Sequence, residues 1–311
     1  MRWLDQYVYE HRSRFIHVMN YKICQILPDP LFLRINFRIR FGMKLNLNNP
    51  ESFNEKMQWM KLYDRKPEYS RLADKFEVKD YIAKTIGDKY IVPLYGVYNS
   101  YEEIDFSLLP ERFVLKPTHT SGDVFLCADK NKIDYARLKE EVNKWLKRKY
   151  YWVNREWHYK NIRPRIICEK YIANPSDGDL KDFKFMCFEG EVKCCVVCAN
   201  RKSPGGLTMD YYDMDWQHLP MMYAWPNNDG LIAKPKHFAE MVEIARMLSR
   251  DMPFIRVDLY DTEDQPYFGE LTLYPGSGYG LFKPDTYDYL FGSWIHLDIE
   301  HSAPAFRRVK Q

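Results

Sequence analysis

The segment that most constrains the fold of this chain is residues 254–280, FIRVDLYDTEDQPYFGELTLYPGSGYG. Two runs of alternating apolar and polar residues flank the turn-rich DTEDQP, a pattern that predicts an antiparallel hairpin. A turn centred in that stretch sets Asp258 opposite Glu270 and Arg256 opposite Thr272. Because side chains alternate along a strand with a period of two, these four polar residues share one face of the hairpin.

The two faces of the predicted hairpin differ in character. The apolar face carries Ile255, Val257, Leu259, Gly269, Leu271 and Leu273, and the polar face also holds Phe254, Tyr260, Phe268 and Tyr274. Two ionised carboxylates about 5 Å apart across the strands repel each other unless a cation lies between them, and Mg²⁺ prefers oxygen ligands. The aromatic residues favour a cleft that holds a metal. A solvated cluster of salt bridges is the alternative interpretation.

The pattern RVDLY…FGELTLYPGSG resembles the metal-binding end of the ATP-grasp ligases, in which Arg-x-Asp on one strand precedes Glu-x-Asn and Pro-Gly on the next. The resemblance implies that Asp258 and Glu270 ligate Mg²⁺ and that Arg256 contacts phosphate or an acylphosphate. Thr272 stands where the family has Asn, and its hydroxyl is a weaker metal ligand than an amide carbonyl. The loop that follows would cover the substrate, with Ser277 and Gly278 as contacts.

The amino-acid composition limits the class of protein to which this chain can belong. The 311 residues are 46% hydrophobic and 16% aromatic, enough for two or three lobes with substantial cores. No apolar run approaches the ~20 residues of a spanning helix, and no signal peptide is evident, so we expect a cytoplasmic protein with reduced thiols. Cys194, Cys195 and Cys198 are expected to be small core residues, because no second ligand pair follows at zinc spacing.

Residues 1–48 are basic, with eight Lys or Arg against three acids, and are interleaved with aromatic and aliphatic residues. Such a segment can lie on the inner, anionic face of a membrane. We favour the alternative, a helical cap that packs on the catalytic body. The rest of the chain is close to neutral, which argues against general nucleic-acid binding.

Two helices are predicted before the first strand. Ser52 is a plausible N-cap, and Glu55 completes a capping box for the first helix. The second helix runs from Arg71 to Gly87 and places Lys75 and Lys79 one turn apart.

The runs NPESFNEKMQWMK, LADKFEVKDYI and YIVPLYGVYNSYEEIDF resemble the TupA-like branch of ATP-grasp proteins, which is found with surface-polysaccharide biosynthesis. The resemblance covers about residues 45–295. It implies that Lys75 and Lys79 help to hold an anionic substrate; surface lysines are the alternative.

A strand at 112–117, the loop THTSGD and a strand at 124–127 are similar to the phosphate-binding part of ATP-grasp enzymes. The similarity implies that Lys116 reaches the α- and β-phosphates and that the backbone of Thr120, Ser121 and Gly122 folds over the β- and γ-phosphates. His119 either contacts the transferring phosphoryl group or is a solvent-facing turn residue. The loop contains a single glycine, where related loops have more.

The helix predicted at 134–149 ends in a basic and aromatic stretch that we interpret as a lid, with plain packing of its tryptophans as the alternative. Residues 163–172 resemble the ATP-grasp hinge, which implies an adenine site at Glu169, Lys170, Tyr171 and Ile172, with Lys170 and Ile172 acting through main-chain groups. A hairpin at 182–198 presents Lys184 as a second phosphate contact, and Arg201 is a candidate for binding substrate carboxylate.

We therefore expect an α+β ATP-grasp fold with a small lid lobe and a larger C-terminal lobe built on a mixed or antiparallel sheet. The expected segments are an N-terminal helical segment at 1–48, an N-terminal lobe at 49–110, a lid lobe at 111–175, a metal and substrate lobe at 176–300 and a basic tail at 301–311.

The resemblance implies an ADP-forming carboxylate–amine ligase that uses ATP and Mg²⁺, with an acylphosphate intermediate and with Lys116, Lys184 and Arg256 as catalytic residues. The expected substrates are small molecules, namely an amine and the uronic-acid carboxyl of a nucleotide sugar or glycan in capsule or other surface-polysaccharide synthesis. One alternative is a glycosyltransferase that uses Asp213-x-Asp215. A non-catalytic nucleotide-binding scaffold is the other.

Overall fold

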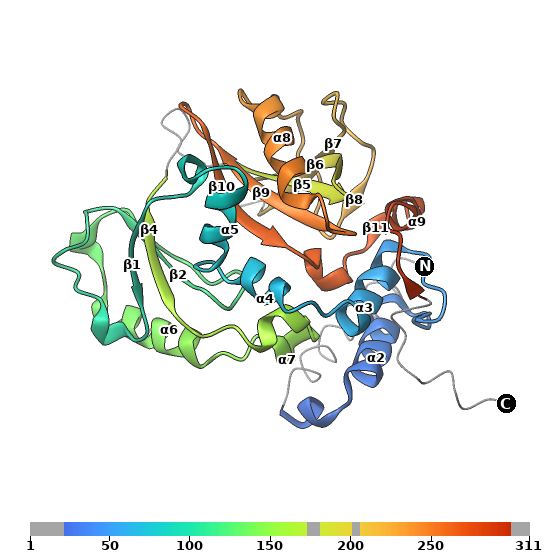
Figure 1. Cartoon of the computed structure of the whole chain (residues 1–311), viewed down its shortest axis with the longest axis horizontal. Helices are drawn as coiled ribbons and strands as arrows, with labels where there is room; N and C mark the ends of the chain where they lie inside the picture. Colours follow the sequence, from blue (N-terminus) through green and yellow to red (C-terminus); the bar gives the residue numbers. More distant parts are fainter. Residues whose placement is uncertain (1–21, 173–180, 201–205, 300–311) are drawn as a thin grey trace. The chain divides into compact units, whose positions relative to one another are not determined.

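The computed structural model describes residues 22–172, 181–200 and 206–299 (Figure 1). The chain divides into two compact units that are both discontinuous in sequence. Unit 1 comprises Met1–Arg65, Tyr151–Trp157 and Tyr274–Gln311, and unit 2 comprises Lys66–Tyr150 and His158–Leu273.

Unit 1 is mainly helical in its described part. Its longer helices are α2 (Asp29–Phe41), α3 (Phe53–Tyr63) and α9 (Thr286–Ser293), and its short elements are η1 (Lys22–Ile26), α7 (Tyr151–Asn154), η6 (Pro275–Gly278) and β11 (Phe282–Lys283). Helix α3 packs against both α2 and α9. Phe53 at the start of α3 meets Phe282 and Phe291 edge to face, with ring centres 5.9 and 6.1 Å away. Aromatic packing of this kind forms the core of the unit.

The predicted capping box at the start of α3 is confirmed. The Ser52 hydroxyl accepts the N–H of Glu55, and the Glu55 carboxylate accepts the N–H of Ser52. Glu55 also accepts the N–H groups of Asn46 and Glu51. One buried carboxylate thus fixes both the helix start and the chain that leads into it.

Replacing Ser52 with Ala removes this cap, and we expect the free energy of unfolding to fall by about 1 kcal/mol. Urea denaturation followed by circular dichroism measures the change. Ser293→Ala is the control, because the exposed Ser293 hydroxyl donates within α9 to Leu290 and caps no helix start. A loss in Ser52→Ala no larger than that in the control would contradict the prediction.

Unit 2 contains a four-stranded antiparallel sheet in the order β1-β4-β2-β3. The strands are β1 (Leu94–Tyr98), β2 (Phe113–Pro117), β3 (Phe125–Cys127) and β4 (Ile166–Lys170), and helix α6 (Tyr135–Lys147) covers one face. Leu138, Val142 and Trp145 of α6 belong to the core cluster on that face. The opposite face carries Lys116 and Glu169, so the sheet separates a packed side from a polar one.

The second sheet of unit 2 has the antiparallel order β10-β9-β5-β6-β7. Its strands are β5 (Asp182–Phe188), β6 (Glu191–Ala199), β7 (Thr208–Tyr212), β9 (Ile255–Asp261) and β10 (Pro266–Thr272), and α8 (Phe238–Ser249) packs on it. Figure 1 shows α8 above this sheet. Cys194, Cys195 and Cys198 of β6 are buried, as expected for small core residues.

The register of the β9–β10 hairpin is the one that the sequence predicts, with Asp258 opposite Glu270 and Arg256 opposite Thr272. The expectation for Phe268 is wrong. A bulge at Gly269 pairs Phe268 with Leu259 and places its ring in the core, 4% exposed. The bulge suits glycine, because a Cβ at Gly269 would lie 3.0 Å from the carbonyl oxygen of Asp258.

The single helix predicted at 71–87 is also wrong. The structure has α4 (Glu68–Ala73) and α5 (Val78–Thr85), separated by a turn. Asp74 is the C-cap residue of α4, and its carboxylate accepts the N–H groups of Phe76 and Glu77 at 2.8 and 3.2 Å, which stabilises the turn between the two helices. Lys75 therefore lies in the turn and not on the helix that carries Lys79.

The remaining short elements of the described chain are η2 (Asp88–Tyr90), η3 (Tyr101–Glu103), η4 (Lys130–Lys132), η5 (Trp157–Lys160) and β8 (Met222–Tyr223). Among the described residues, no helix combines the length and the apolar character needed to cross a bilayer. The expected basic tail at 301–311 and residues 1–21 of the expected N-terminal segment lie outside the described residues.

Candidate functional site

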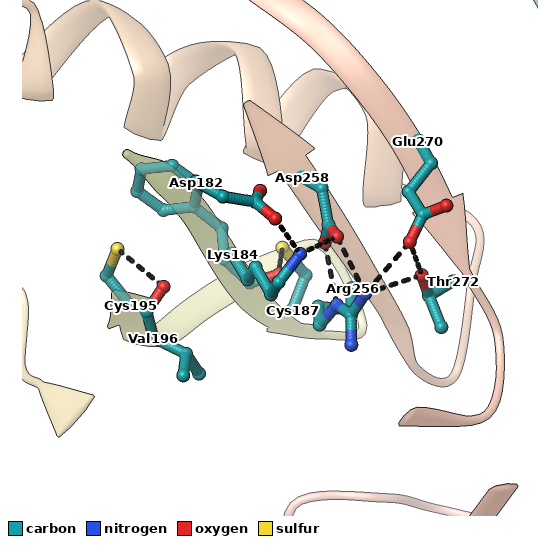
Figure 2. Close-up of polar contacts among 10 residues, drawn as sticks. Asp182, Lys184, Cys187, Cys195, Val196, Arg256, Asp258, Glu270 and Thr272 are labelled. Atoms are coloured by element: carbon teal, nitrogen blue, oxygen red, sulfur yellow. Dashed lines mark hydrogen bonds and ion pairs between the residues drawn. The ribbon is translucent and has the colours of Figure 1, made fainter. Parts of the chain in front are cut away.

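A charged cluster lies on one face of the larger sheet, where β5, β9 and β10 run side by side (Figure 2). Lys184 of β5 lies between two carboxylates. Its ammonium donates to Asp182 at 2.5 Å and to Asp258. The Lys184 side chain is 8% exposed and that of Asp258 is 2% exposed, so these are buried ion pairs. Burial opposes the charged form of Lys184, but the two carboxylates outweigh it and raise its pKa.

Arg256 joins the other half of the cluster. Its Nε and Nη2 donate to the two oxygens of Asp258, both at 2.6 Å. The same Nη2 donates to Glu270 Oε1 at 3.1 Å and to Thr272 Oγ1 at 2.9 Å. The Thr272 hydroxyl in turn donates to Glu270 Oε1 at 3.2 Å. One guanidinium therefore spans both strands of the hairpin, which fixes the polar side chains relative to one another.

Asp258 and Glu270, which face each other across the hairpin, have pKa values that are shifted in opposite directions. Burial raises the pKa of Asp258 to about 6, against the opposing effect of Arg256 and Lys184. Burial also opposes ionisation of Glu270, but Lys184, Arg256 and Lys75 outweigh it and lower its pKa to about 2. Both groups are therefore mainly ionised at neutral pH. Three carboxylates, counting Asp182, face the two cations Lys184 and Arg256.

Glu270 is the carboxylate of this cluster with room for a ligand. Its side chain is 36% exposed, whereas both oxygens of Asp258 receive hydrogen bonds from Arg256 and Lys184. Within the part of the chain that the structure describes, no group of three or more His, Cys, Asp or Glu side chains is arranged to hold a metal. A carboxylate and a hydroxyl still suit Mg²⁺, which binds through one or two carboxylates together with waters and substrate phosphates.

A second charged cluster lies on the face of the smaller sheet opposite α6. Glu169 of β4 is 5% exposed and accepts Lys79 at 2.5 Å and Lys116 at 2.9 Å. Burial disfavours the ionised forms of Lys116 and Glu169. Their ion pairing outweighs this effect, so the pKa of Lys116 is raised and that of Glu169 is lowered. Glu169 therefore serves as a counterion that holds two lysines. The sequence alone does not predict this pairing.

An apolar surface adjoins Lys116. Val114, Leu126 and Glu169 pair across β2, β3 and β4, so they share the face that Lys116 occupies two residues further along β2. Leu126 is 49% exposed on this face. The neighbouring hinge residues are constrained in part, because the N–H of Lys170 donates to Pro93 and Tyr171 stacks on Arg112.

The loop between β2 and β3 is tied to the turn that contains Lys75. The Lys75 N–H donates to the Thr118 carbonyl at 3.2 Å, and its ammonium donates to the Thr120 carbonyl. His119 is 3% exposed, and its Nε2 lies 3.0 Å from the Trp145 carbonyl oxygen at the end of α6. The solvent-facing alternative for His119 is therefore wrong. Burial lowers its pKa, which favours the neutral ring.

Lys75 and Glu270 also line one pocket of unit 2, together with Leu72, Ala73, Val78, Tyr159, Gly269 and Leu271. Burial lowers the pKa of Lys75, and Glu270 opposes this effect. A carboxylate of the larger sheet and a lysine tied to the loop therefore border the same space.

The other predicted residues are distributed as follows. Lys79 pairs with Glu169, Ser277 and Gly278 belong to unit 1, and Arg201 lies outside the described residues. Asp213 of the alternative metal motif accepts the N–H groups of Asp215 and Gln217, as a turn residue does. Sequence reasoning missed Asp182, although its position two residues before Lys184 on one strand places both on the same face.

An α+β chain with a basic sheet face, a small-residue loop and a carboxylate pair on a second sheet has the organisation of the ATP-grasp class. The family model of TupA-like ATP-grasp proteins matches residues 55–296, and the chain belongs to that family. This confirms the predicted family and fold class.

Solved structures similar to this chain include a D-alanine–D-alanine ligase from Bacillus anthracis in complex with ATP. That match has 16% identity and a TM-score of 0.40, and covers 65% of this chain and 55% of the other. An L-amino acid ligase from Bacillus licheniformis matches with 14% identity and a TM-score of 0.44, over 81% of this chain and 56% of the other. The match thus spans little more than half of each of these ligases. A comparison with curated proteins finds no match.

The low pKa of Glu270 predicts how the cluster responds to acid. Its folded value, about 2, lies below the ordinary 4.5, so its pairing stabilises the fold above about pH 5 and is lost as the pH falls toward 2. We expect the difference in unfolding free energy between the wild type and Glu270→Gln to shrink between pH 7 and pH 4. Urea titrations at both pH values measure it, with the exposed Glu263→Gln as control. An unchanged difference would contradict the assignment.

Proposed function

We propose that this protein is an ADP-forming carboxylate–amine ligase that uses Mg²⁺ and ATP in surface-polysaccharide biosynthesis. The observation that carries the proposal is the cluster on β5, β9 and β10, in which Arg256 binds Asp258, Glu270 and Thr272 together (Figure 2). Such a cluster places fixed cations beside carboxylates that suit a metal, which is the environment that phosphoryl transfer requires.

The smaller sheet supplies the nucleotide site in this proposal. The ATP base lies on the apolar surface around Leu126, near the hinge at 169–172, and Lys116 binds the phosphates as a point charge. The loop of Thr120, Ser121 and Gly122 covers the terminal phosphates through its backbone. Gly122 supports this with a left-handed φ of 83°, and a Cβ added there would meet no atom within 4 Å, so the loop tip has room.

Glu270 and Thr272 would hold the metal, with Asp258 as a further ligand. When bound, Mg²⁺ neutralises charge on the phosphates. The structure supports a specific role for the cations that now surround Asp258. Phosphate oxygens that approach Lys184 and Arg256 compete with Asp258 for the same N–H donors, and so free its carboxylate.

The proposed chemistry needs no nucleophilic side chain. An oxygen of the substrate carboxylate attacks the γ-phosphorus of ATP, the bond to the bridging oxygen breaks, and ADP leaves. The amine nitrogen then attacks the acyl carbon, phosphate leaves with the C–O bonding electrons, and the nitrogen loses a proton. Lys116, Lys184 and Arg256 stabilise the negative charge that moves between these oxygens. Lys75, which borders the pocket with Glu270, binds the anionic substrate.

The proposed carboxylate is that of a uronic acid on a nucleotide sugar or glycan. Its support is the family assignment together with Lys75, the basic residue that borders the pocket, since an anionic sugar is attracted by lysine. Glycosyl transfer is the second candidate, but the Asp213 carboxylate that it would need already holds a turn.

Glu270→Gln tests the reaction. The purified chain is incubated with Mg·ATP, a UDP-uronic acid and a pool of small amines, and ADP release is measured. We expect release that needs both co-substrates and falls at least about a hundredfold in Glu270→Gln. Glu263→Gln, an exposed residue in the hairpin turn, should match the wild type. UDP release from the sugar without ADP formation would overturn the ligase in favour of glycosyl transfer.

Leu126→Glu tests the position of the base. A charge on the apolar face beside Lys116 and Glu169 should weaken Mg·ATP binding by about 1–2 kcal/mol, roughly tenfold. Isothermal titration calorimetry with a non-hydrolysable ATP analogue measures the affinity. Leu108→Glu is the matched control, because Leu108 is 82% exposed in unit 2 and lies outside the strands of that sheet. Equal affinities for the two variants would place the base elsewhere.

A further inference from the structure

Helix α2 of unit 1, dark blue in Figure 1, has two faces of different character. One face is packed inside the unit, and its buried residues are Phe32, Leu33, Asn36 and Phe37. The opposite face carries Leu31, Arg34 and Arg38, all of which are exposed. Residues three, four or seven positions apart lie on the same side of an α-helix, so these three side chains form one surface, the outer face of α2.

The two arginines of the outer face have no acidic partner. They lie one turn apart, and none of the residues three or four positions from Arg34 or Arg38 is acidic. Neither forms an ion pair with any residue that the structure describes. The only acid of α2, Asp29, is engaged within unit 1, where it pairs with Arg65 and Arg155 at 2.7 and 3.1 Å. Like charges at this spacing repel each other, so an anion outside the helix would stabilise the pair.

Helix α6 of unit 2 shows the pattern of a helix surface that only faces water. Its exposed Arg137 pairs with Glu141 at 3.1 Å, and its exposed Lys144 pairs with Glu140 at 3.8 Å. In both pairs the acid lies one turn away on the same helix, an arrangement that stabilises a solvated helix. The outer face of α2 departs from this pattern, because its cations have no acid within reach on the helix.

Exposed aliphatic side chains accompany the arginines. Leu31 on the outer face is 46% exposed, Ile26 shortly before the helix is 80% exposed, and Met43 shortly after it is 46% exposed. Lys44 adds another exposed cation, and residues 30–50 include no acid. This part of the chain therefore presents apolar and cationic side chains together and lacks the acids that would neutralise them.

We propose that the outer face of α2 binds the surface of an anionic lipid bilayer. Aliphatic side chains fit a partner with an apolar interior, cations fit one with a negative surface, and an anionic bilayer offers both. A nucleic acid would match the charge alone. In the bound state α2 lies along the membrane plane, with Arg34 and Arg38 at the lipid phosphates and Leu31 at the boundary of the acyl chains. This binding goes beyond the proposed reaction and needs neither ATP nor substrate.

Vesicle sedimentation of the full chain tests the charged part of the face. We expect binding to vesicles of phosphatidylglycerol mixed with phosphatidylcholine, none to phosphatidylcholine alone, and weaker binding as the salt concentration rises. Arg34→Gln combined with Arg38→Gln should weaken binding about thirtyfold. Arg137→Gln combined with Lys144→Gln is the matched control, because it removes the same charge from α6 and should leave binding unchanged.

The same assay tests the apolar part. Leu31→Gln should weaken binding about fivefold, because the polar side chain stays in the headgroup layer. Leu108→Gln is its control, since Leu108 is 82% exposed in unit 2 and should not contact the bilayer. All the substituted side chains are exposed, and circular dichroism checks that the variants fold.

Several outcomes would overturn the proposal. One is equal binding by the wild type and the arginine variant, and another is the absence of wild-type binding to anionic vesicles. A dimer in analytical ultracentrifugation that Leu31→Gln dissociates, without vesicle binding, would assign the face to a second copy of the chain. Lower thermal stability of Leu31→Gln without vesicle binding would assign it to another segment of the same chain. Binding to single-stranded DNA in place of vesicles would assign it to nucleic acid.

Discussion

The ion pairs of Asp258 are the interaction on which the arrangement of the candidate site depends. This carboxylate is 2% exposed and binds Lys184 on the neighbouring strand and Arg256 on its own strand. Removing one member of a buried ion pair leaves an uncompensated charge, at a cost of about 3–5 kcal/mol. The residues therefore constrain one another, and Arg256 extends the constraint to Glu270 and Thr272 on β10.

The smaller sheet holds a comparable cluster of buried charges, but in this cluster the cations outnumber the carboxylates. There one buried carboxylate, Glu169, holds two lysines, Lys79 and Lys116. In both clusters the protein supplies its own counterions, so the charged groups stay ordered in the absence of a ligand. In the proposed function, a phosphate bound by these groups would replace an existing partner and would not have to order a flexible side chain, which would lower the entropic cost of binding.

Local patterns make parts of this structure predictable. The capping box of Ser52 and Glu55 needs only four residues, and alternation around a short turn predicts the pairing of Asp258 with Glu270. Alternation alone misplaces Phe268, because the bulge at Gly269 depends on close approach to the Asp258 carbonyl, a contact that the pattern does not encode. The pairing of Glu169 with Lys116 depends on the register of strands that are about 50 residues apart, for which the sequence offers no local signal.

Helix α3 shows why burial is the harder property to predict. Gln58 and Lys61 are three residues apart, so they share a face of the helix, and a polar pair at that spacing ordinarily indicates a solvated surface. Here that face is fully buried, and the polar groups meet carbonyls of a left-handed loop, Pro275–Gly278. The sequence does contain the complementary signal, since Pro-Gly-Ser-Gly predicts an irregular backbone. The sequence does not indicate that this face of α3 and this loop are in contact. Only the folded chain brings the buried donors of Gln58 and Lys61 to the carbonyl groups of the loop.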